Sequence, residues 1–466
     1  MPFSKKLIAT LKLVDKKEIK NLRKFIQFSS TDKITIAIFD YWDTQLKNSY
    51  AELDNETAWK YLFPKKIFLK DNWRTYCSLL NTLIEKFLIY EQLKTDEILQ
   101  QRLLTKVLEK KKQAKKTYQK LEKLIENQPL SASKSLQLNQ YYEALFEQNF
   151  KQKVDNKDDT LKYFFKHLDD FYFLQKLKFS NVALAQSTIF KKKISIFLLD
   201  EILSLTLQNT DNELITIHAN LTKLYREDSK EQYELAIKYF DQHKEIISKE
   251  EQIVIFAHLQ NFLIRKNNQG EKWVVIPLFE LKKQGIELTI TEITATSFVN
   301  TVSAGCLAKE FNYCETFIEK YQNSLPNANK EIVISLSNAT LLFHRFIEKG
   351  DRDNLEKILE INKNISTLKG DLLYNLSLRL VISKTLFELY KLNSSYTAVL
   401  QNEIQKFKQY ITQKKLSSEK TELYFNFCTY LQKISDKSHD SEALSTLKTE
   451  IQQLNVVNKK WLLEQC

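Results

Sequence analysis

Glycine and proline are scarce in this sequence. Its 466 residues include five glycines and five prolines, whereas average usage of roughly 7% and 5% would give about thirty and about twenty. Strand-rich folds need both residues for tight turns, and loops that hold phosphate groups need glycine for close backbone approach. The composition argues against both classes and predicts an all-α protein whose turns are built from Asn, Ser, Asp and Lys.

Signals for disulfides, metal sites and membrane segments are also lacking. The five cysteines are scattered without a CxxC pair, and the six histidines have no partner four residues away. Lys12 and Asp15 fall where a signal peptide would need an unbroken apolar core. No apolar run approaches the roughly eighteen residues of a transmembrane helix. We expect a reduced, soluble, cytoplasmic protein without a membrane span, a metal or a cofactor.

Familiar catalytic motifs do not occur. The patterns GxGxxG, GxxxxGK[ST], HExxH and GxSxG are all missing from the sequence. We therefore expect no catalytic residues and predict that the protein is not an enzyme.

Positive charge is concentrated in the N-terminal quarter. Residues 1–126 contain 26 Lys and Arg against 16 Asp and Glu, a net charge of +10, and the remaining 340 residues have 44 against 42, a net charge of +2. A basic surface attracts nucleic acid, anionic membranes or acidic proteins, and charge alone does not choose among them.

The segment "KVLEKKKQAKKTYQKLEKLIEN" (106–127) contains eight lysines. We expect it to lie in one helix from about Asp96 to Asn127. That helix would have a heptad seam formed by Leu104, Val107, Lys111, Ala114, Tyr118, Leu121 and Ile125. A solvated helix face is the leading interpretation of the lysines, with nucleic acid and an acidic protein or membrane surface as alternatives. The candidate basic patch consists of Lys110, Lys112, Lys115, Lys116 and Lys120.

Two further patterns describe the N-terminal half. Helical spacing predicts four helices between Asp15 and Leu93. The later segment "TLKYFFKHLDDFYFLQKLKFS" has seven aromatic residues between Tyr163 and Phe179. These aromatics could stack on nucleic-acid bases, but their 3.6-residue period favours the packed core of a helix. The apolar positions that we expect to be buried are Leu161, Phe164, Phe165, Leu168, Phe171 and Tyr172.

A repeat of about 40 residues follows from about residue 190. Polar turns are centred on Asp228, Asn268, Lys309, Gly350, Lys391 and Gln432, each with an apolar helical segment on either side. Such a period predicts an α-solenoid of about six helix pairs, because one pair cannot bury its apolar face alone. The expected organisation is a basic helical region (1–94), a long helical connector (95–190) and the solenoid (191–466).

Some of these segments resemble known families. "NTVSAGCLAKEFNYCETFIEKYQNSLP" (300–326) resembles tetratricopeptide units. The chain as a whole is similar to an uncharacterised family of long all-helical bacterial proteins with such repeats, through "EIKNLRKFIQF", "WKYLFPKK", "HLDDFYFLQKLKFSNVALAQ" and "FLIRKNNQG". The resemblance implies the repeat fold and no activity.

In tetratricopeptide-like arrays the first helix of each pair lines a groove that binds an extended peptide. Positions six residues before the turns give a polar row of Ser303, His344, Thr385 and Asn426, and His258 and Arg265 extend the candidate groove. We therefore predict a non-enzymatic scaffold that binds a protein partner through this groove. The alternative is a nucleic-acid-binding regulator that uses the basic N-terminal region.

Overall fold

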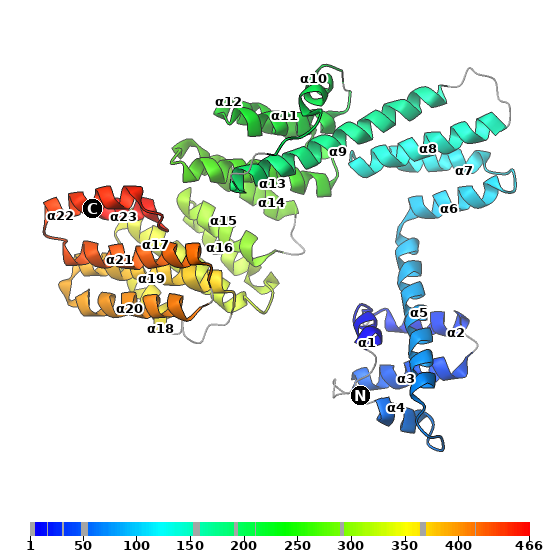
Figure 1. The fold of residues 1–466 in the computed structure, drawn as a ribbon, viewed down its shortest axis with the longest axis horizontal. Coiled ribbons are helices and arrows are strands. Elements are labelled where there is room, and N and C mark those ends of the chain that lie inside the picture. The colour runs from blue at the N-terminus through cyan, green and yellow to red at the C-terminus, as the bar shows by residue number, and fades with distance from the viewer. Residues whose placement is uncertain are drawn as a thin grey trace. The chain divides into compact units, whose positions relative to one another are not determined.

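The computed structural model describes residues 5–15, 17–29, 32–47, 55–151, 159–190, 194–209, 211–288, 293–363, 370–414 and 416–466. Every regular element in these ranges is a helix and none is a strand (Figure 1), which confirms the predicted all-α class. The chain divides into two compact units, residues 1–172 (unit 1) and residues 173–466 (unit 2). The expected segment borders at residues 94 and 190 lie at helix ends, since α5 ends at Thr95 and α9 at Phe190.

Unit 1 contains one more N-terminal helix than the sequence predicted, because α1 precedes the four expected helices. Its helices are α1 (Lys5–Leu11), α2 (Ile19–Ser29), α3 (Lys33–Lys47), α4 (Asn55–Leu62), α5 (Lys70–Thr95), α6 (Glu97–Glu109), α7 (Lys115–Glu126), α8 (Ala132–Lys151) and the first part of α9 (Thr160–Phe190).

The 26-residue helix α5 is the centre of the first core of unit 1. α1, α2 and α3 pack against α5 and bury Trp73, Leu80, Ile84 and Phe87. The indole Nε1 of Trp73 donates to Asn55 Oδ1 at 3.0 Å, so this large ring is buried without leaving its donor unsatisfied. A second, smaller core joins α6, α7 and α8 around Tyr118 and Tyr141.

The aromatic segment of α9 is not the packed core that its periodicity predicted. Phe164 contacts the second core of unit 1, and Tyr163 stacks on Tyr142 of α8 with ring centroids 5.2 Å apart. By contrast, Phe165 remains 56% exposed. Smaller but still substantial fractions are exposed for Leu161, Leu168 and Tyr172. A helical period identifies an apolar stripe but not whether a partner covers it.

Unit 2 contains the rest of α9 and helices that follow one another mostly as pairs. Its helices are α10 (Leu199–Asn209), α11 (Glu213–Glu227), α12 (Lys230–His243), α13 (Lys249–Asn268), α14 (Val275–Leu288), α15 (Ala295–Leu307), α16 (Phe311–Tyr321), α17 (Lys330–Lys349), α18 (Arg352–Lys363), α19 (Leu372–Leu392), α20 (Thr397–Gln413), α21 (Ser418–Asp436), α22 (Ser441–Gln453) and α23 (Lys459–Gln465). Four short 3₁₀ turns accompany them: Lys244–Ile246, Lys272–Val274, Gln322–Ser324 and Ser394–Tyr396.

Several of the predicted turns coincide with helix ends that adopt a left-handed backbone. Asp228, Lys309 and Gly350 have φ angles of 49°, 62° and 71° directly after or near the ends of α11, α15 and α17. A left-handed residue ends a helix because it redirects the chain while its amide still bonds the last turn. The later turns fit less closely, since α21 continues to Asp436, four residues beyond Gln432.

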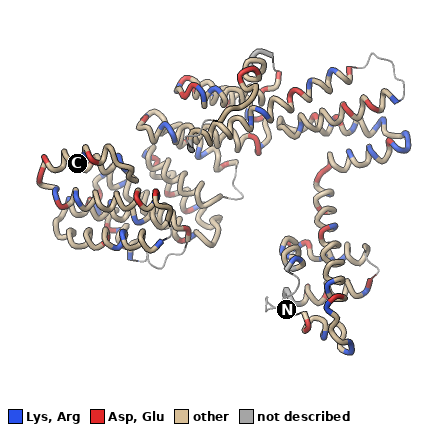
Figure 2. The backbone as a smooth tube through the Cα atoms, viewed as in Figure 1, with Lys and Arg blue, Asp and Glu red and all other residues tan. Residues whose placement is uncertain are grey.

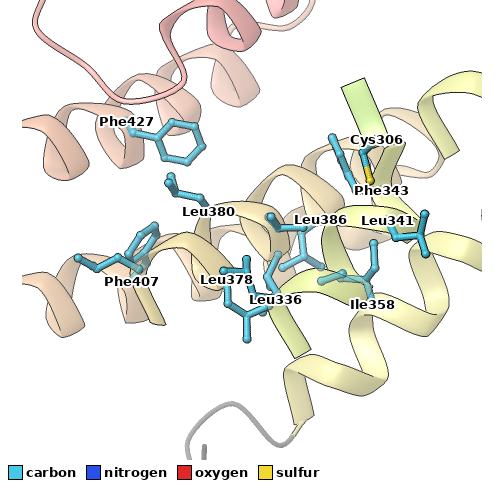
Figure 3. Close-up of a cluster of buried hydrophobic side chains, with 14 of the residues drawn as sticks. Cys306, Leu336, Leu341, Phe343, Ile358, Leu378, Leu380, Leu386, Phe407 and Phe427 are labelled. Atoms are coloured by element: carbon cyan, nitrogen blue, oxygen red, sulfur yellow. The ribbon is translucent and has the colours of Figure 1, made fainter. Parts of the chain in front are cut away.

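The main core of unit 2 surrounds α19. This helix is buried on nearly all sides, and α17, α18 and α20 pack along it. Figure 3 shows Leu378, Leu380 and Leu386 of α19 in one cluster with side chains from the neighbouring helices. Because neighbouring helices cover α19 on nearly all sides, α19 leaves little surface for a ligand.

One contact in this core leads to a testable prediction about Gly305. A Cβ atom at this position in α15 would lie 2.5 Å from Cys314 Sγ and 3.3 Å from Phe279 Cε2. Cys314 is fully buried, so its sulfur cannot move into solvent. We expect Gly305→Ala to lower the free energy of unfolding by about 1–3 kcal/mol through overpacking, although alanine ordinarily favours a helix by about 1 kcal/mol over glycine. Urea denaturation would measure the change.

Gly285 of α14 is the matched control, because a Cβ there would meet only the end of the Gln260 side chain at 3.2 Å, compared with a sulfur at 2.5 Å for Gly305. Gly285→Ala should therefore cost clearly less stability than Gly305→Ala. Adding Cys314→Ala to Gly305→Ala should recover part of the lost stability, and a double variant no better than the sum of the single changes would contradict the proposed clash.

Candidate functional site

The lysine-rich segment forms a helical hairpin, which corrects the prediction of one continuous helix. α6 ends at Glu109 and α7 begins at Lys115. Between them Lys112 has a φ of 58°, and Gln113 N donates to Leu108 O at 2.9 Å. Folding back lets Tyr118, Leu121 and Ile125 of α7 pack within unit 1. The expected heptad seam is therefore broken, and its first members, Leu104 and Val107, are 46% and 52% exposed.

The five patch lysines are all exposed and fall into two groups. Lys110 and Lys112 are in the turn of the hairpin, and Lys115, Lys116 and Lys120 are on α7. Figure 2 shows Lys and Arg in blue along this hairpin, which Figure 1 labels α6 and α7. Lys120 Nζ lies 3.5 Å from Glu97 Oε1 across the hairpin. An exposed pair of this kind contributes little to stability.

A cleft of about 1130 Å³ opens beside the turn. α6 and the turn contribute Arg102, Lys106, Lys110 and Lys112, which make that side basic. α8 contributes Glu143 and Glu147 together with three glutamines and Lys151. The full lining is Arg102, Thr105, Lys106, Glu109, Lys110, Lys112, Tyr118, Leu121, Gln137, Gln140, Tyr141, Glu143, Ala144, Glu147, Gln148 and Lys151.

Buried tyrosines of α7 and α8 contribute to the lining of the cleft. The Tyr118 and Tyr141 rings are edge to face, with centroids 5.9 Å apart. The Tyr118 hydroxyl donates to the Glu109 carboxylate and lies 3.3 Å from Ala144 O. Burial, with smaller contributions from nearby glutamates, raises the pKa of both phenols. They therefore stay protonated near neutral pH, and Tyr118 holds Glu109 in place.

The charges of the cleft are mixed. Five basic and three acidic side chains line it, so its net charge is +2. Amide side chains such as Gln137, Gln140 and Gln148 can both donate to and accept from a peptide backbone. Sequence analysis identified Lys110 and Lys112 and missed the other lining residues. Of these, Lys106, Glu109, Tyr118 and Leu121 lay in the lysine-rich segment, and the residues from α8 carried no signal of their own.

The residues of the predicted groove are not equally accessible. Ser303, His344 and Asn426 are half-buried, and Asn426 Nδ2 donates to Asn455 O at 3.0 Å. Burial, with a smaller contribution from Lys384, lowers the pKa of His344 to about 4.

Three other groove residues have partners inside unit 2. Thr385 is fully buried, and its hydroxyl donates to Val381 O of its own helix at 2.9 Å. His258 is buried, with Nδ1 2.8 Å from the Tyr225 hydroxyl, and Arg265 forms an ion pair with Asp228. The expectation that His258 and Thr385 face a ligand is therefore corrected, because the surrounding helices enclose them.

A buried polar network in unit 2 was not predicted. Glu251 of α13 is 4% exposed, and its Oε1 accepts from Lys178 Nζ of α9 at 2.8 Å. Its Oε2 lies 3.7 Å from Nε2 of the fully buried His218. Burial opposes the charge of Glu251, but His218 and Lys178 outweigh it and lower the pKa of this carboxyl to about 2. In the sequence, "SKEEQIV" reads as an exposed helix start, so only the packing of α9 and α11 identifies the network.

Asn181 completes this network. Asn181 Nδ2 donates to His218 O at 3.0 Å, and its Oδ1 accepts from the Thr222 hydroxyl at 2.8 Å. The network thus joins α9, α11 and α13. Because the charge of Glu251 is balanced inside the protein, the network holds these helices in register.

The described residues contain no cluster of three or more His, Cys, Asp and Glu side chains that could hold a metal ion. Within the same ranges, no helix combines the length and the apolar character needed to cross a bilayer. Comparisons with family models, with curated proteins and with solved structures find no match to this chain.

Proposed function

We propose that this protein is a non-enzymatic scaffold that binds a segment of a protein partner in the cleft of unit 1. The cleft is the observation that supports this proposal. Its basic side, its two exposed glutamates and its glutamines suit a polypeptide with charges of both signs better than they suit a uniformly anionic ligand. The volume of about 1130 Å³ can accommodate several side chains.

Unit 2 would serve as the framework of this scaffold. The order of helix pairs and the packing of α15 on α17 and of α17 on α19 support a tetratricopeptide-like α-solenoid. We place the partner in the cleft rather than in the solenoid groove, because α19 is enclosed and Thr385 is buried. All five cysteines are free thiols, which supports a site of action in the reducing cytoplasm.

Nucleic acid is the second candidate ligand, and the exposed lysines of the hairpin favour it. Lysine side chains neutralise phosphates and release counterions, so such binding would be strongly salt-dependent. Glu143 and Glu147 oppose it, because phosphate groups in the cleft would lie near two carboxylates. The two candidate ligands therefore predict opposite effects when these glutamates are neutralised.

We expect Glu143→Gln with Glu147→Gln to weaken capture of the protein partner about tenfold, since two charge contacts would be lost at roughly 0.5–1 kcal/mol each. If nucleic acid is the ligand, the same variant should bind more tightly. The measurement is affinity capture from native lysate, with and without nuclease, followed by titration of the recovered partner. Tighter binding by the double variant, or capture that disappears with nuclease, would contradict the proposal in favour of nucleic acid.

Two triple variants that remove equal charge provide a matched control. The first variant alters the cleft through Lys106→Gln, Lys110→Gln and Lys112→Gln. The second alters exposed lysines outside the cleft through Lys115→Gln, Lys116→Gln and Lys120→Gln. Only the first set should weaken capture of the partner. Equal losses, with a salt dependence reduced by roughly 0.7–0.9 per contact, would indicate binding of phosphates by the whole hairpin.

A further inference from the structure

An exposed apolar stripe follows one side of α9 in unit 1. Its members, which we call the α9 seam, are Leu161, Phe165, Leu168 and Tyr172, and they are 43%, 56%, 38% and 45% exposed. They are separated by four, three and four residues, which is the spacing of the a and d positions of a coiled coil. Seven residues after Tyr172, beyond the polar and half-buried Gln175, Phe179 and Val182 return to this register and are also exposed.

The charges beside the α9 seam indicate what could cover it. Lys162 and Asp169 each follow a seam leucine by one residue, so both lie on the same flank of the seam. Both side chains are exposed. The other flank carries Phe164 and Phe171, each one residue before a seam aromatic. Opposite charges therefore share one flank, and the other flank is apolar.

A second copy of this chain satisfies these charges in one orientation. When two identical helices pair antiparallel about a two-fold axis, the flank with Lys162 and Asp169 on one copy faces the same flank on the other copy. The two chains run in opposite directions, so the residues of one flank meet those of the other in reverse order. With Phe165 opposite Leu168 of the second copy, Lys162 then lies near Asp169 of that copy and Asp169 near its Lys162. A parallel pair would instead place Lys162 and Asp169 against the apolar flank.

We propose that the α9 seam is a homodimer interface in which two copies of α9 pair antiparallel. The pairing removes eight exposed apolar side chains from water, four from each copy, and adds two symmetric ion pairs at the rim. The ion pairs set the orientation and the apolar side chains supply the affinity. This surface is separate from the cleft residues, so dimerisation and partner capture can fail independently.

Light scattering coupled to size exclusion, on the full chain over the micromolar range, tests the proposal. We expect a mass of twice 55.1 kDa for the unmodified protein. Phe165→Glu with Leu168→Glu should raise the dissociation constant about a hundredfold or more and give the mass of one chain. Circular dichroism should show unchanged helix content, because both side chains are exposed. An unmodified protein that keeps the mass of one chain at every concentration would overturn the proposal.

Two further variants test specificity and orientation. Ile89→Glu in α5 introduces the same charge at a side chain that is 67% exposed and outside the seam, and this variant should remain dimeric. Lys162→Asp and Asp169→Lys should each weaken the dimer, because each places two like charges side by side. The two changes together should restore the dimer, because each ion pair re-forms with its charges exchanged between the two positions. Dissociation of the Ile89 variant, or a double exchange weaker than either single change, would show that the antiparallel α9 interface is wrong.

Discussion

Glu251→Ala is expected to lower the free energy of unfolding by about 1.5–3 kcal/mol, because it removes the buried carboxylate that accepts a charged hydrogen bond from Lys178 Nζ. In this protein the change would leave Lys178 and the fully buried His218 without the carboxylate that they share. It would also weaken the network that joins α9, α11 and α13. Urea or thermal denaturation followed by circular dichroism measures the loss.

Glu250 provides the matched control for this prediction. It is the adjacent residue in the first turn of α13 and is exposed. Glu250→Ala removes the same charge from the same helix end and should cost only a few tenths of a kcal/mol. Similar losses from Glu250→Ala and Glu251→Ala would mean that the buried network contributes nothing beyond helix electrostatics.

The second large effect is a loss of stability in acid that begins below about pH 6.5. Burial, with a smaller contribution from His218, lowers the pKa of His258 to about 4, and the pKa of His344 is lowered to about 4 as well. Between about pH 6.5 and about pH 4 each of these histidines binds a proton in the unfolded chain but not in the folded one. Each histidine therefore lowers the free energy of unfolding by up to about 1.4 kcal/mol for every pH unit by which the pH falls in this range.

Glu251 extends this loss to lower pH. Its pKa is lowered to about 2, so its stabilising contribution is complete above the pKa of an unfolded glutamate, about 4.3. That contribution disappears as the pH falls from there towards 2. The whole acid transition should therefore run from about pH 6.5 to about pH 2, with the histidines acting first and the carboxylate last.

Urea denaturation at a series of pH values measures this transition. His258→Gln with His344→Gln should flatten the slope between about pH 6.5 and about pH 4, although both changes cost stability at neutral pH. His439→Gln, at an exposed position, should leave the slope unchanged. A free energy of unfolding that is constant from pH 7 to pH 4 would contradict the assignment of imidazoles that stay neutral in the folded chain.

Part of the candidate site could be predicted from the sequence. The lysine-rich segment drew attention to Lys110 and Lys112, and both line the cleft. The facing residues of α8 could not be predicted, because nothing local distinguishes Glu143 or Glu147 from any other charge on a helix surface. They belong to the site only because the chain reverses at Lys112 and brings α6 and α8 to the same cleft.

By itself, the sequence determined the helical class and several helix ends. With five glycines and five prolines, the chain has few residues that interrupt a helix. Nearly every segment with a helical spacing of apolar residues therefore forms a helix. Turns were also predicted at Asp228, Lys309 and Gly350, where the structure has a left-handed backbone, because helix ends of this kind depend on local residues and short backbone hydrogen bonds.

Only the tertiary structure decided which apolar stripes are covered. Thr385 looked like a ligand contact and is enclosed by the helices around α19, whereas Phe165 looked like core and is exposed. Glu251, which no pattern in the sequence singled out, is buried with Lys178 and His218. The physical reason is the same in each case: burial depends on neighbours that are distant in the sequence, and a helical period carries no information about them.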